Sequence, residues 1–228
     1  VHVIYSNLVH IDQWGVYVYP QSATARQGVL NIEVNVKNES ASASKLIVKN
    51  ELISSDGKIV AQSSGKLDIP ANAVGKYNNT LKVKTPKLWS LNFPNLYTLN
   101  TTIIQSGKII DKTSTTTGFR TFTFDPNKGF ALNKEWLKIK GVCLHHDAGV
   151  LGSAVPKEVW KAIGVNAIRT THNPQSPELY ELCDELGLLV LNEVYDEWEF
   201  PKRKWLEGWN VGTPGFEGNF DYFEEWCE

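Results

Sequence analysis

The chain changes its hydrophobic rhythm near residue 120, and this change constrains the fold more than any other feature. Between Val29 and Arg120, apolar and polar residues alternate in short segments rich in Val, Ile and Thr, as in NIEVNVKN (31–38) and KIIDKTSTTTGF (108–119). Such alternation is typical of strands with one buried and one exposed face. After Phe130 the apolar residues come instead in continuous runs. We therefore expect two domains of different class.

The alternating part predicts six or seven short strands. Turn signals separate them at the spacing of antiparallel hairpins: SSDGK (54–58), PANAVG (70–75) and QSGK (105–108). The stretch HIDQWGVYVYP (10–20) supplies a further strand or the linker into it. Because no helical pattern interrupts these segments, they favour an all-β immunoglobulin-like sandwich.

The second part alternates apolar runs with helical patterns. The runs are LKIKGVCLHH (137–146), NAIRTTH (166–172) and LLVLNE (188–193). Between the last two, SPELYELCDELG predicts a helix that begins at Pro177 after a Ser176 cap and ends before Gly187. This order indicates a parallel sheet covered by helices, and we interpret it as the first βα units of a (β/α)8 TIM barrel. The helical pattern between Pro156 and Gly164 is too short for a normal crossover, so we expect residues to be missing after Lys161.

Composition excludes several functional classes. A hydrophobic content of 42% and a charged content of 21% are typical of globular proteins, and a net charge of −2 gives no basis for binding nucleic acid or an anionic membrane. No apolar run approaches the roughly 20 residues of a membrane span. The three cysteines are odd in number and far apart, which argues against a disulfide framework or a metal site, and we expect buried thiols at Cys143, Cys183 and Cys227.

Several longer stretches resemble glycoside hydrolase family 2, and within it bacterial β-galactosidases most of all. They are LWSLNFPNLYTL (88–99), GFR (118–120), KIKGVCLHHDAG (138–149), IRTTHNPQSPELYELCDELGLLVLNEVYDEW (168–198) and EGWNVGTPGF (207–216). Members of this family have a jelly roll, an immunoglobulin-like sandwich and then a catalytic barrel. The resemblance implies that residues 1–12 are the last jelly-roll strand and a linker, 13–122 the sandwich, and 123–228 a truncated N-terminal part of the barrel.

The resemblance also implies that this chain holds no catalytic residue. Retaining glycosidases use two carboxylates, a nucleophile and an acid/base. In the family the acid/base lies in an Asn-Glu pair after the fourth barrel strand and the nucleophile after the seventh, so both would follow residue 228. Asn192-Glu193 follows only the third strand. We expect Glu193 and Asp196 to support the active-site mouth, with Glu193 pairing with a neighbour such as Arg169, and we expect the chain by itself to be inactive.

Three residues at strand ends are expected to bind substrate: His145, Arg169 and His172. The resemblance implies sugar contacts for the two histidines and places Arg169 near the catalytic carboxylates, where its charge would keep one ionised. A structural role for His145 and a structural salt bridge for Arg169 are the alternatives. His145 and His146 cannot share a metal ion, because consecutive strand residues point to opposite faces.

Glu197 is the candidate metal ligand. Some family members bind Mg²⁺ through a Glu at this position and a His two residues later, where this chain has Glu199. Carboxylates suit Mg²⁺, so we leave Mg²⁺ open for the complete enzyme and expect no other cofactor.

The expected function is that of a retaining exo-β-glycosidase that hydrolyses terminal β-D-galactosides. The alternatives are a β-glucuronidase or β-mannosidase of the same family, and a non-catalytic carbohydrate-binding scaffold. The expected partner is a β-galactoside or related oligosaccharide, with neither nucleic acid nor membrane. The oligomeric state of the complete enzyme stays open, and the resemblance is compatible with a homo-oligomer. Localisation stays open, with the periplasm or secretion slightly favoured over the cytoplasm.

Overall fold

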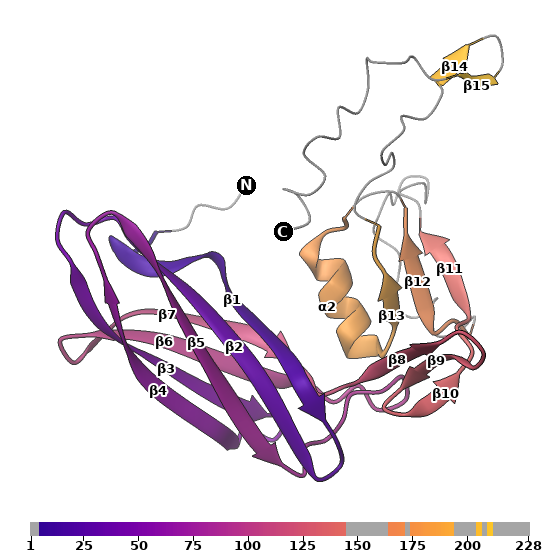
Figure 1. Ribbon diagram of the computed structural model, residues 1–228, viewed down its shortest axis with the longest axis horizontal. Coiled ribbons are helices and arrows are strands. Elements are labelled where there is room, and N and C mark those ends of the chain that lie inside the picture. Colours follow the sequence, from indigo (N-terminus) through magenta and orange to yellow (C-terminus); the bar gives the residue numbers. More distant parts are fainter. Residues whose placement is uncertain (1–4, 145–163, 172–173, 194–203, 207–208, 212–228) are drawn as a thin grey trace. The chain divides into compact units, whose positions relative to one another are not determined.

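The chain divides into two compact units. The computed structural model describes residues 5–144, 164–171, 174–193, 204–206 and 209–211 (Figure 1). One unit contains residues 1–139 with 184–187, and the other contains residues 140–183 with 188–228. His145, His172, Asp196, Glu197, Cys227 and residues 161–163 lie outside the described residues, so the predictions on them, including the missing residues after Lys161, stay predictions.

The first unit is built on a sandwich of two antiparallel sheets. One sheet has the order β1 (Val9–Ala23), β2 (Gln27–Asn38), β5 (Ala73–Lys84). The other has the order β4 (Ile59–Ile69), β3 (Ser44–Ser54), β6 (Tyr97–Gln105), β7 (Lys108–Thr117). These seven strands confirm the all-β sandwich predicted from the alternating pattern. Strand β1 begins before residue 13, because Val9 already pairs with Asn38 of β2.

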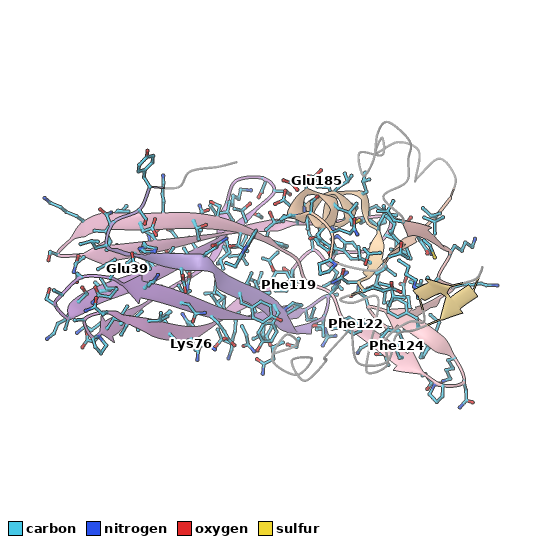
Figure 2. All side chains as sticks on the ribbon, turned by 90° about the horizontal axis from the view of Figure 1, so that it is seen from above. Glu39, Lys76, Phe119, Phe122, Phe124 and Glu185 are labelled. Atoms are coloured by element: carbon cyan, nitrogen blue, oxygen red, sulfur yellow. The ribbon has the colours of Figure 1, made fainter. Side chains whose placement is uncertain are left out.

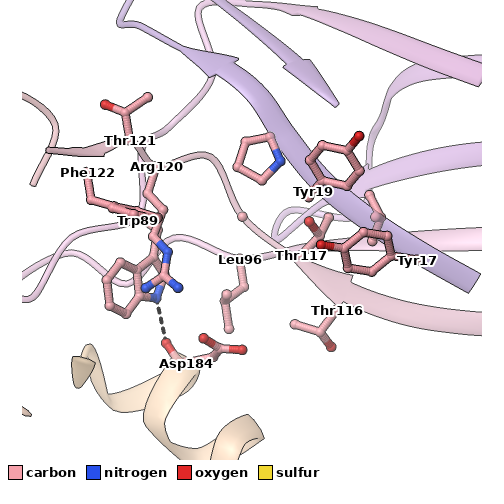
Figure 3. Close-up of a pocket in the computed structure, with 13 residues that line it drawn as sticks. Tyr17, Tyr19, Trp89, Leu96, Thr116, Thr117, Arg120, Thr121, Phe122 and Asp184 are labelled. Carbon is pink, nitrogen blue, oxygen red and sulfur yellow. Dashed lines mark hydrogen bonds between the residues drawn. The ribbon is translucent and has the colours of Figure 1, made fainter. Parts of the chain in front are cut away.

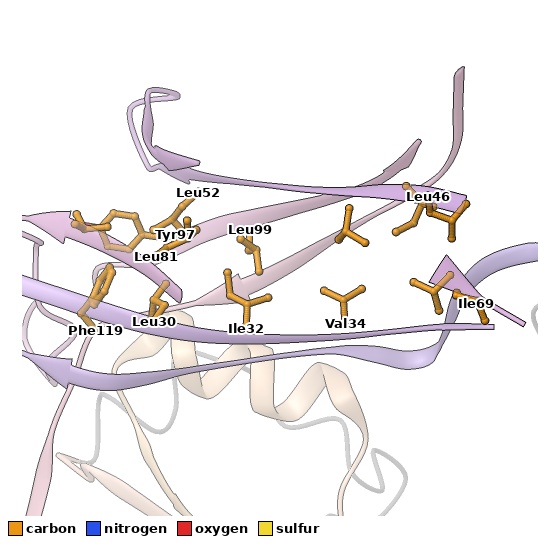
Figure 4. Close-up of a cluster of buried hydrophobic side chains, with 14 of the residues drawn as sticks. Leu30, Ile32, Val34, Leu46, Leu52, Ile69, Leu81, Tyr97, Leu99 and Phe119 are labelled. Atoms are coloured by element: carbon orange, nitrogen blue, oxygen red, sulfur yellow. The ribbon is translucent and has the colours of Figure 1, made fainter. Parts of the chain in front are cut away.

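The inner faces of the two sheets form one hydrophobic core (Figure 4). Every second residue of β2 is fully buried, and burying one such side chain contributes about 1.5–3 kcal/mol. The buried residues of β2 are Leu30, Ile32, Val34 and Val36, and those of the opposite sheet include Val48, Leu52, Leu99 and Ile103. The period of two in the sequence therefore places the core between the sheets.

Phe119 fills one end of this core (Figure 4), whereas Lys76 points outward from the sandwich (Figure 2). The Phe119 ring meets that of Tyr97 edge-on, with 5.1 Å between centroids. A Cβ added at Gly28 would come within 2.4 Å of the Phe119 ring, so glycine is needed there for close packing. On the outer face, Lys76 of β5 forms an ion pair with Glu33 of β2.

Asn38 is a fully buried polar residue at the end of β2. Its Nδ2 donates to the carbonyl oxygens of Ser42 (2.9 Å) and Pro70 (2.8 Å), and its Oδ1 accepts hydrogen bonds from the backbone N (3.1 Å) and Oγ (2.6 Å) of Ser40. These bonds satisfy the amide inside the protein. They join the loop after β2 to the loop after β4.

A small antiparallel sheet follows the sandwich and was not predicted from the sequence. Its order is β10 (Glu135–Leu137), β9 (Gly129–Leu132), β8 (Phe122–Asp125). Phe130 and Leu132 of β9 are buried. Asn133, after β9, donates from Nδ2 to the carbonyl oxygen of Trp89 at 2.9 Å, which fastens this sheet to the segment after β5.

The second unit contains a parallel sheet of the order β11 (Gly141–Leu144), β12 (Ala167–Thr170), β13 (Leu189–Leu191). This parallel pairing confirms the start of a barrel predicted from the apolar runs. Helix α2 (Pro177–Leu186), of which residues 184–186 are counted with the first unit, has the predicted bounds and buries Leu179 and Cys183. Gly187 has a φ of +71°, a conformation suited to glycine just after a helix. A hairpin, β14 (Lys204–Leu206) and β15 (Trp209–Val211), comes next in the chain.

Candidate functional site

The candidate site lies where the parallel strands β12 and β13 end. In the register of the sheet, Cys143, Arg169 and Leu191 are partners on adjacent strands, so their side chains share one face. Ile168, next to Arg169, points to the opposite face and is fully buried. The alternation within β12 therefore presents a guanidinium on the face that also carries Cys143 and Leu191.

Arg169 pairs with Glu193, which follows the end of β13. The Nε of Arg169 donates to Glu193 Oε1 at 2.5 Å, and a terminal guanidinium nitrogen contacts the same oxygen. The Arg169 side chain is 50% exposed and that of Glu193 only 15%. The hydrogen bond to Glu193, followed by the charge of that carboxylate, raises the pKa of Arg169 above its ordinary value. The pairing expected from the sequence is confirmed, while the role of the pair stays a prediction.

Thr170 and Asn192 join the same two strand ends through their side chains. Thr170 is fully buried, and its Oγ1 donates to Asn192 Oδ1 at 3.2 Å and accepts from the backbone N of Glu193 at 2.8 Å. Tyr180 of α2 donates its hydroxyl proton to the same Asn192 oxygen at 2.6 Å. The backbone N of Gln175 in turn donates to the Tyr180 hydroxyl at 2.9 Å. This network fixes the backbone from which Glu193 projects.

Neither Thr170 nor Tyr180 stands out in the sequence as a site residue, and Asn192 does so only together with Glu193. Thr170 could have been found as a hydroxyl residue at the end of an apolar run. Tyr180 lies next to the apolar stripe of its helix, and its hydroxyl group reaches Asn192 just after the end of β13. Its partner could not be read from local spacing, because Asn192 is twelve residues away.

A further pair of bonds holds β11 to the end of β12. Thr171 donates from Oγ1 to the carbonyl oxygen of Leu144 at 2.6 Å, and its backbone N donates to the same oxygen at 3.2 Å. Thr171 is 7% exposed. This contact therefore fixes the end of β11 at Leu144 against the residue that follows β12.

The expectation of buried thiols is right for Cys183 but wrong for Cys143. Cys183 is 1% exposed on α2, whereas Cys143 is exposed. The reason is the alternation of β11, which turns Cys143 to the face of Arg169 rather than to the face of the buried Ile168.

Within the described ranges, no group of three His, Cys, Asp or Glu side chains is placed to hold a metal ion. Glu197 is not among these residues, so the Mg²⁺ site stays a prediction. No helix in the described part of the chain has the length and apolar character needed to cross a membrane.

Both units match models of one protein family. Residues 9–120 match glycosyl hydrolases family 2, and residues 126–199 match the TIM barrel domain of glycosyl hydrolases family 2. The chain belongs to glycosyl hydrolase family 2. The second match covers β12, β13 and the Arg169–Glu193 pair, so the candidate site lies in the barrel domain of this family.

Similar proteins carry more than one activity in their names. A beta-galactosidase from Bacteroides ovatus is 36% identical over 96% of this chain, and a beta-glucuronidase from Formosa agariphila is 28% identical over 82% of it. The crystal structure of a glycosyl hydrolase family 2 member from Bacteroides cellulosilyticus matches 86% of the chain with a TM-score of 0.80 and 32% identity. The chain spans only 25%, 20% and 26% of the lengths of these three proteins.

Proposed function

We propose that this chain is part of a retaining exo-β-glycosidase that hydrolyses terminal β-D-galactosides. Membership of glycosyl hydrolase family 2 supports glycoside hydrolysis, and the similarity to a beta-galactosidase supports the sugar. The single observation that carries the proposal is the Arg169–Glu193 pair at the ends of two adjacent parallel strands. In TIM barrels, the residues at these strand ends form the active site.

In this proposal, Arg169 and Glu193 position other groups and do not transfer protons. Glu193 is mostly buried and bound to a guanidinium, which favours the charged form of its carboxylate. An acid that protonates a leaving group must start in its neutral form. Glu193 is therefore poorly suited to be the acid/base, although it belongs to an Asn-Glu pair. The half-exposed Arg169 can direct its charge toward a further carboxylate or a sugar hydroxyl.

The two catalytic carboxylates are proposed to belong to the part of the complete protein that follows residue 228. A retaining mechanism needs them about 5–5.5 Å apart, one as nucleophile and one as acid/base. His145 and His172 would contact the sugar ring, and Asp196 would support the mouth together with Glu193. Under this proposal the 228-residue chain alone gives no hydrolysis of p-nitrophenyl β-D-galactoside, and measurable turnover by it would contradict the assignment of the catalytic groups.

The second candidate is a β-glucuronidase, which the beta-glucuronidase relatives favour; a β-mannosidase is a further alternative. A panel of p-nitrophenyl β-D-galactoside, β-D-glucuronide and β-D-mannoside, assayed with the complete protein, distinguishes them by kcat/KM. We expect the galactoside to be the best substrate. A higher kcat/KM for either other sugar would replace the galactosidase proposal, and sugar binding without turnover of any substrate would support a non-catalytic scaffold.

A further inference from the structure

The first unit contains a half-open cleft of about 640 Å³ that the proposed hydrolysis does not use (Figure 3). Its lining comes from β1, from the end of β7 and from the segment that follows β7, with Trp89, Leu96 and Asp184 completing the wall. The volume falls within the roughly 300–1,000 Å³ of typical small-molecule sites. The cleft is therefore large enough for a ligand with several functional groups.

Aromatic rings line the part of the cleft formed by β1. Tyr17 and Tyr19 lie two residues apart and share one face of the strand, with ring centroids 5.0 Å apart and planes tilted by 32°. Tyr17 is 61% exposed, and Phe122, on the segment after β7, is 60% exposed. Rigid rings that remain accessible in a hollow offer apolar faces to a ligand at low entropic cost.

Tyr19 is held in place by a polar neighbour. Asn31 of β2 donates from Nδ2 to the Tyr19 hydroxyl at 3.2 Å, across the β1–β2 pairing that places these two residues opposite each other. The fixed Tyr19 in turn supports the exposed Tyr17 ring against which it packs. One side of the cleft is thus a pre-organised aromatic surface.

Polar groups line the remaining wall. The Arg120 guanidinium carbon lies 4.8 Å from the centre of the Trp89 ring, a cation–π arrangement that restrains the long side chain. Trp89 itself is buried, and its indole Nε1 donates to the carbonyl oxygen of Asp184 at 2.8 Å. Thr116 and Thr121 add hydroxyl groups to the lining. Charge is supplied by one cation, Arg120, and one anion, Asp184, so the lining has no net charge to attract an ion.

We propose that this cleft binds a neutral oligosaccharide, with the C–H face of a pyranose ring against Tyr17 and its hydroxyls bonded to Arg120 and the threonines. A sugar combines apolar C–H faces with an equatorial rim of donors and acceptors, which matches aromatic rings flanked by fixed polar groups. This proposal goes beyond the proposed hydrolysis, because it assigns a binding role to the sandwich unit. It does not depend on the identity of the catalytic carboxylates.

The test is a titration of the ¹⁵N-labelled 228-residue chain with β-1,4-galactotetraose, followed by amide chemical shifts. We expect saturable shifts at Thr116, Gly118 and Thr121. Tyr17→Ala is expected to weaken binding about tenfold, as truncation of an aromatic anchor commonly does, while Tyr17→Phe keeps the ring and the affinity. Tyr5→Ala is the matched control, because Tyr5 is 94% exposed and does not line the cleft.

Four results would overturn the proposal. Three of them are the absence of shifts at the cleft, equal weakening by Tyr17→Ala and Tyr5→Ala, and binding that the complete protein lacks, which would mean that another segment covers the cleft. Trigalacturonate tests the charge argument: it is expected to bind no tighter than the neutral sugar, and preferential binding of this anion would contradict a neutral ligand.

Discussion

Arg169 and Glu193 are 24 residues apart in the chain, yet the guanidinium of one donates to a carboxylate oxygen of the other. The parallel pairing of β12 with β13 brings them together, because both residues lie at the same end of adjacent strands. The bond joins a side chain that is half exposed to one that is mostly buried. Such a pair can hold a half-exposed cation in a fixed geometry at the ends of two adjacent strands.

Glu193→Gln tests the positioning role. In the complete protein we expect kcat to fall about ten- to a hundredfold, the range that a small misplacement of active-site groups can produce. Arg169 would lose its anionic partner, and Arg169→Lys should give a loss of similar size, since lysine cannot reproduce the donor arrangement of the guanidinium. Rates with p-nitrophenyl β-D-galactoside measure both. A complete loss in Glu193→Gln that azide restores would identify Glu193 as a catalytic carboxylate instead.

Tyr180→Phe tests the network behind the site. The substitution removes the hydroxyl that donates to Asn192 and accepts from the backbone N of Gln175. We expect the free energy of unfolding of the second unit to fall by about 1 kcal/mol, the usual net contribution of such bonds. Urea denaturation followed by circular dichroism measures the change. Tyr5→Phe, at an exposed position, should change stability by less than about 0.5 kcal/mol, and an equal effect of both variants would argue against the network.

Asn38→Ala tests the buried amide of the sandwich. Several carbonyl oxygens and the Ser40 donors would lose their partner inside the protein, so we expect a loss of about 3 kcal/mol of stability. Asn78→Ala is the control, because Asn78 lies on the exposed face of β5. The two positions are matched in sequence as well, because Asn38 and Asn78 both begin an Asn-X-Ser/Thr triplet. An unfolding midpoint of Asn38→Ala equal to that of the control would show that the buried bonds contribute nothing.

Asp56 gives a prediction on acid stability. The hydrogen bond from Ser54 Oγ (2.5 Å), followed by the bond from Lys58 Nζ (2.9 Å), lowers the pKa of the Asp56 carboxyl well below its ordinary value. A carboxyl with a lowered pKa in the folded state stabilises the fold above its unfolded pKa, and this contribution disappears as pH falls through the folded value.

An NMR titration of the Asp56 side-chain carbon measures this pKa directly. Ser54→Ala should raise the pKa toward the ordinary value, because the bond from Ser54 is the largest single cause, and Lys58→Ala should also raise it by removing the side-chain bond and the charge of Lys58. An unchanged pKa in Ser54→Ala would refute the assignment of the cause.

Much of the fold could be predicted because its determinants are local. Alternating apolar residues define which face of a strand is buried, as in β2, where Leu30, Ile32, Val34 and Val36 all point inward. Ser176, Pro177 and Gly187 mark the ends of α2 through backbone preferences that act within a few residues. The resemblance to a known family then supplied the order of the domains, and the places of Glu193 and Arg169 on neighbouring strands led to the expectation that they pair.

The sequence by itself therefore determined the type of each element and the face that it buries. Through these two properties it also determined the change from sandwich to barrel. The tertiary structure alone decided which elements meet. Three features depend on strand order and register. They are the hydrogen bonds from both Thr170 and Tyr180 to Asn192, the exposure of Cys143, and the cleft lined by Tyr17 and Arg120. The physical reason is that a side chain's direction is set by its own backbone, whereas its partner is set by long-range packing between segments far apart in the chain.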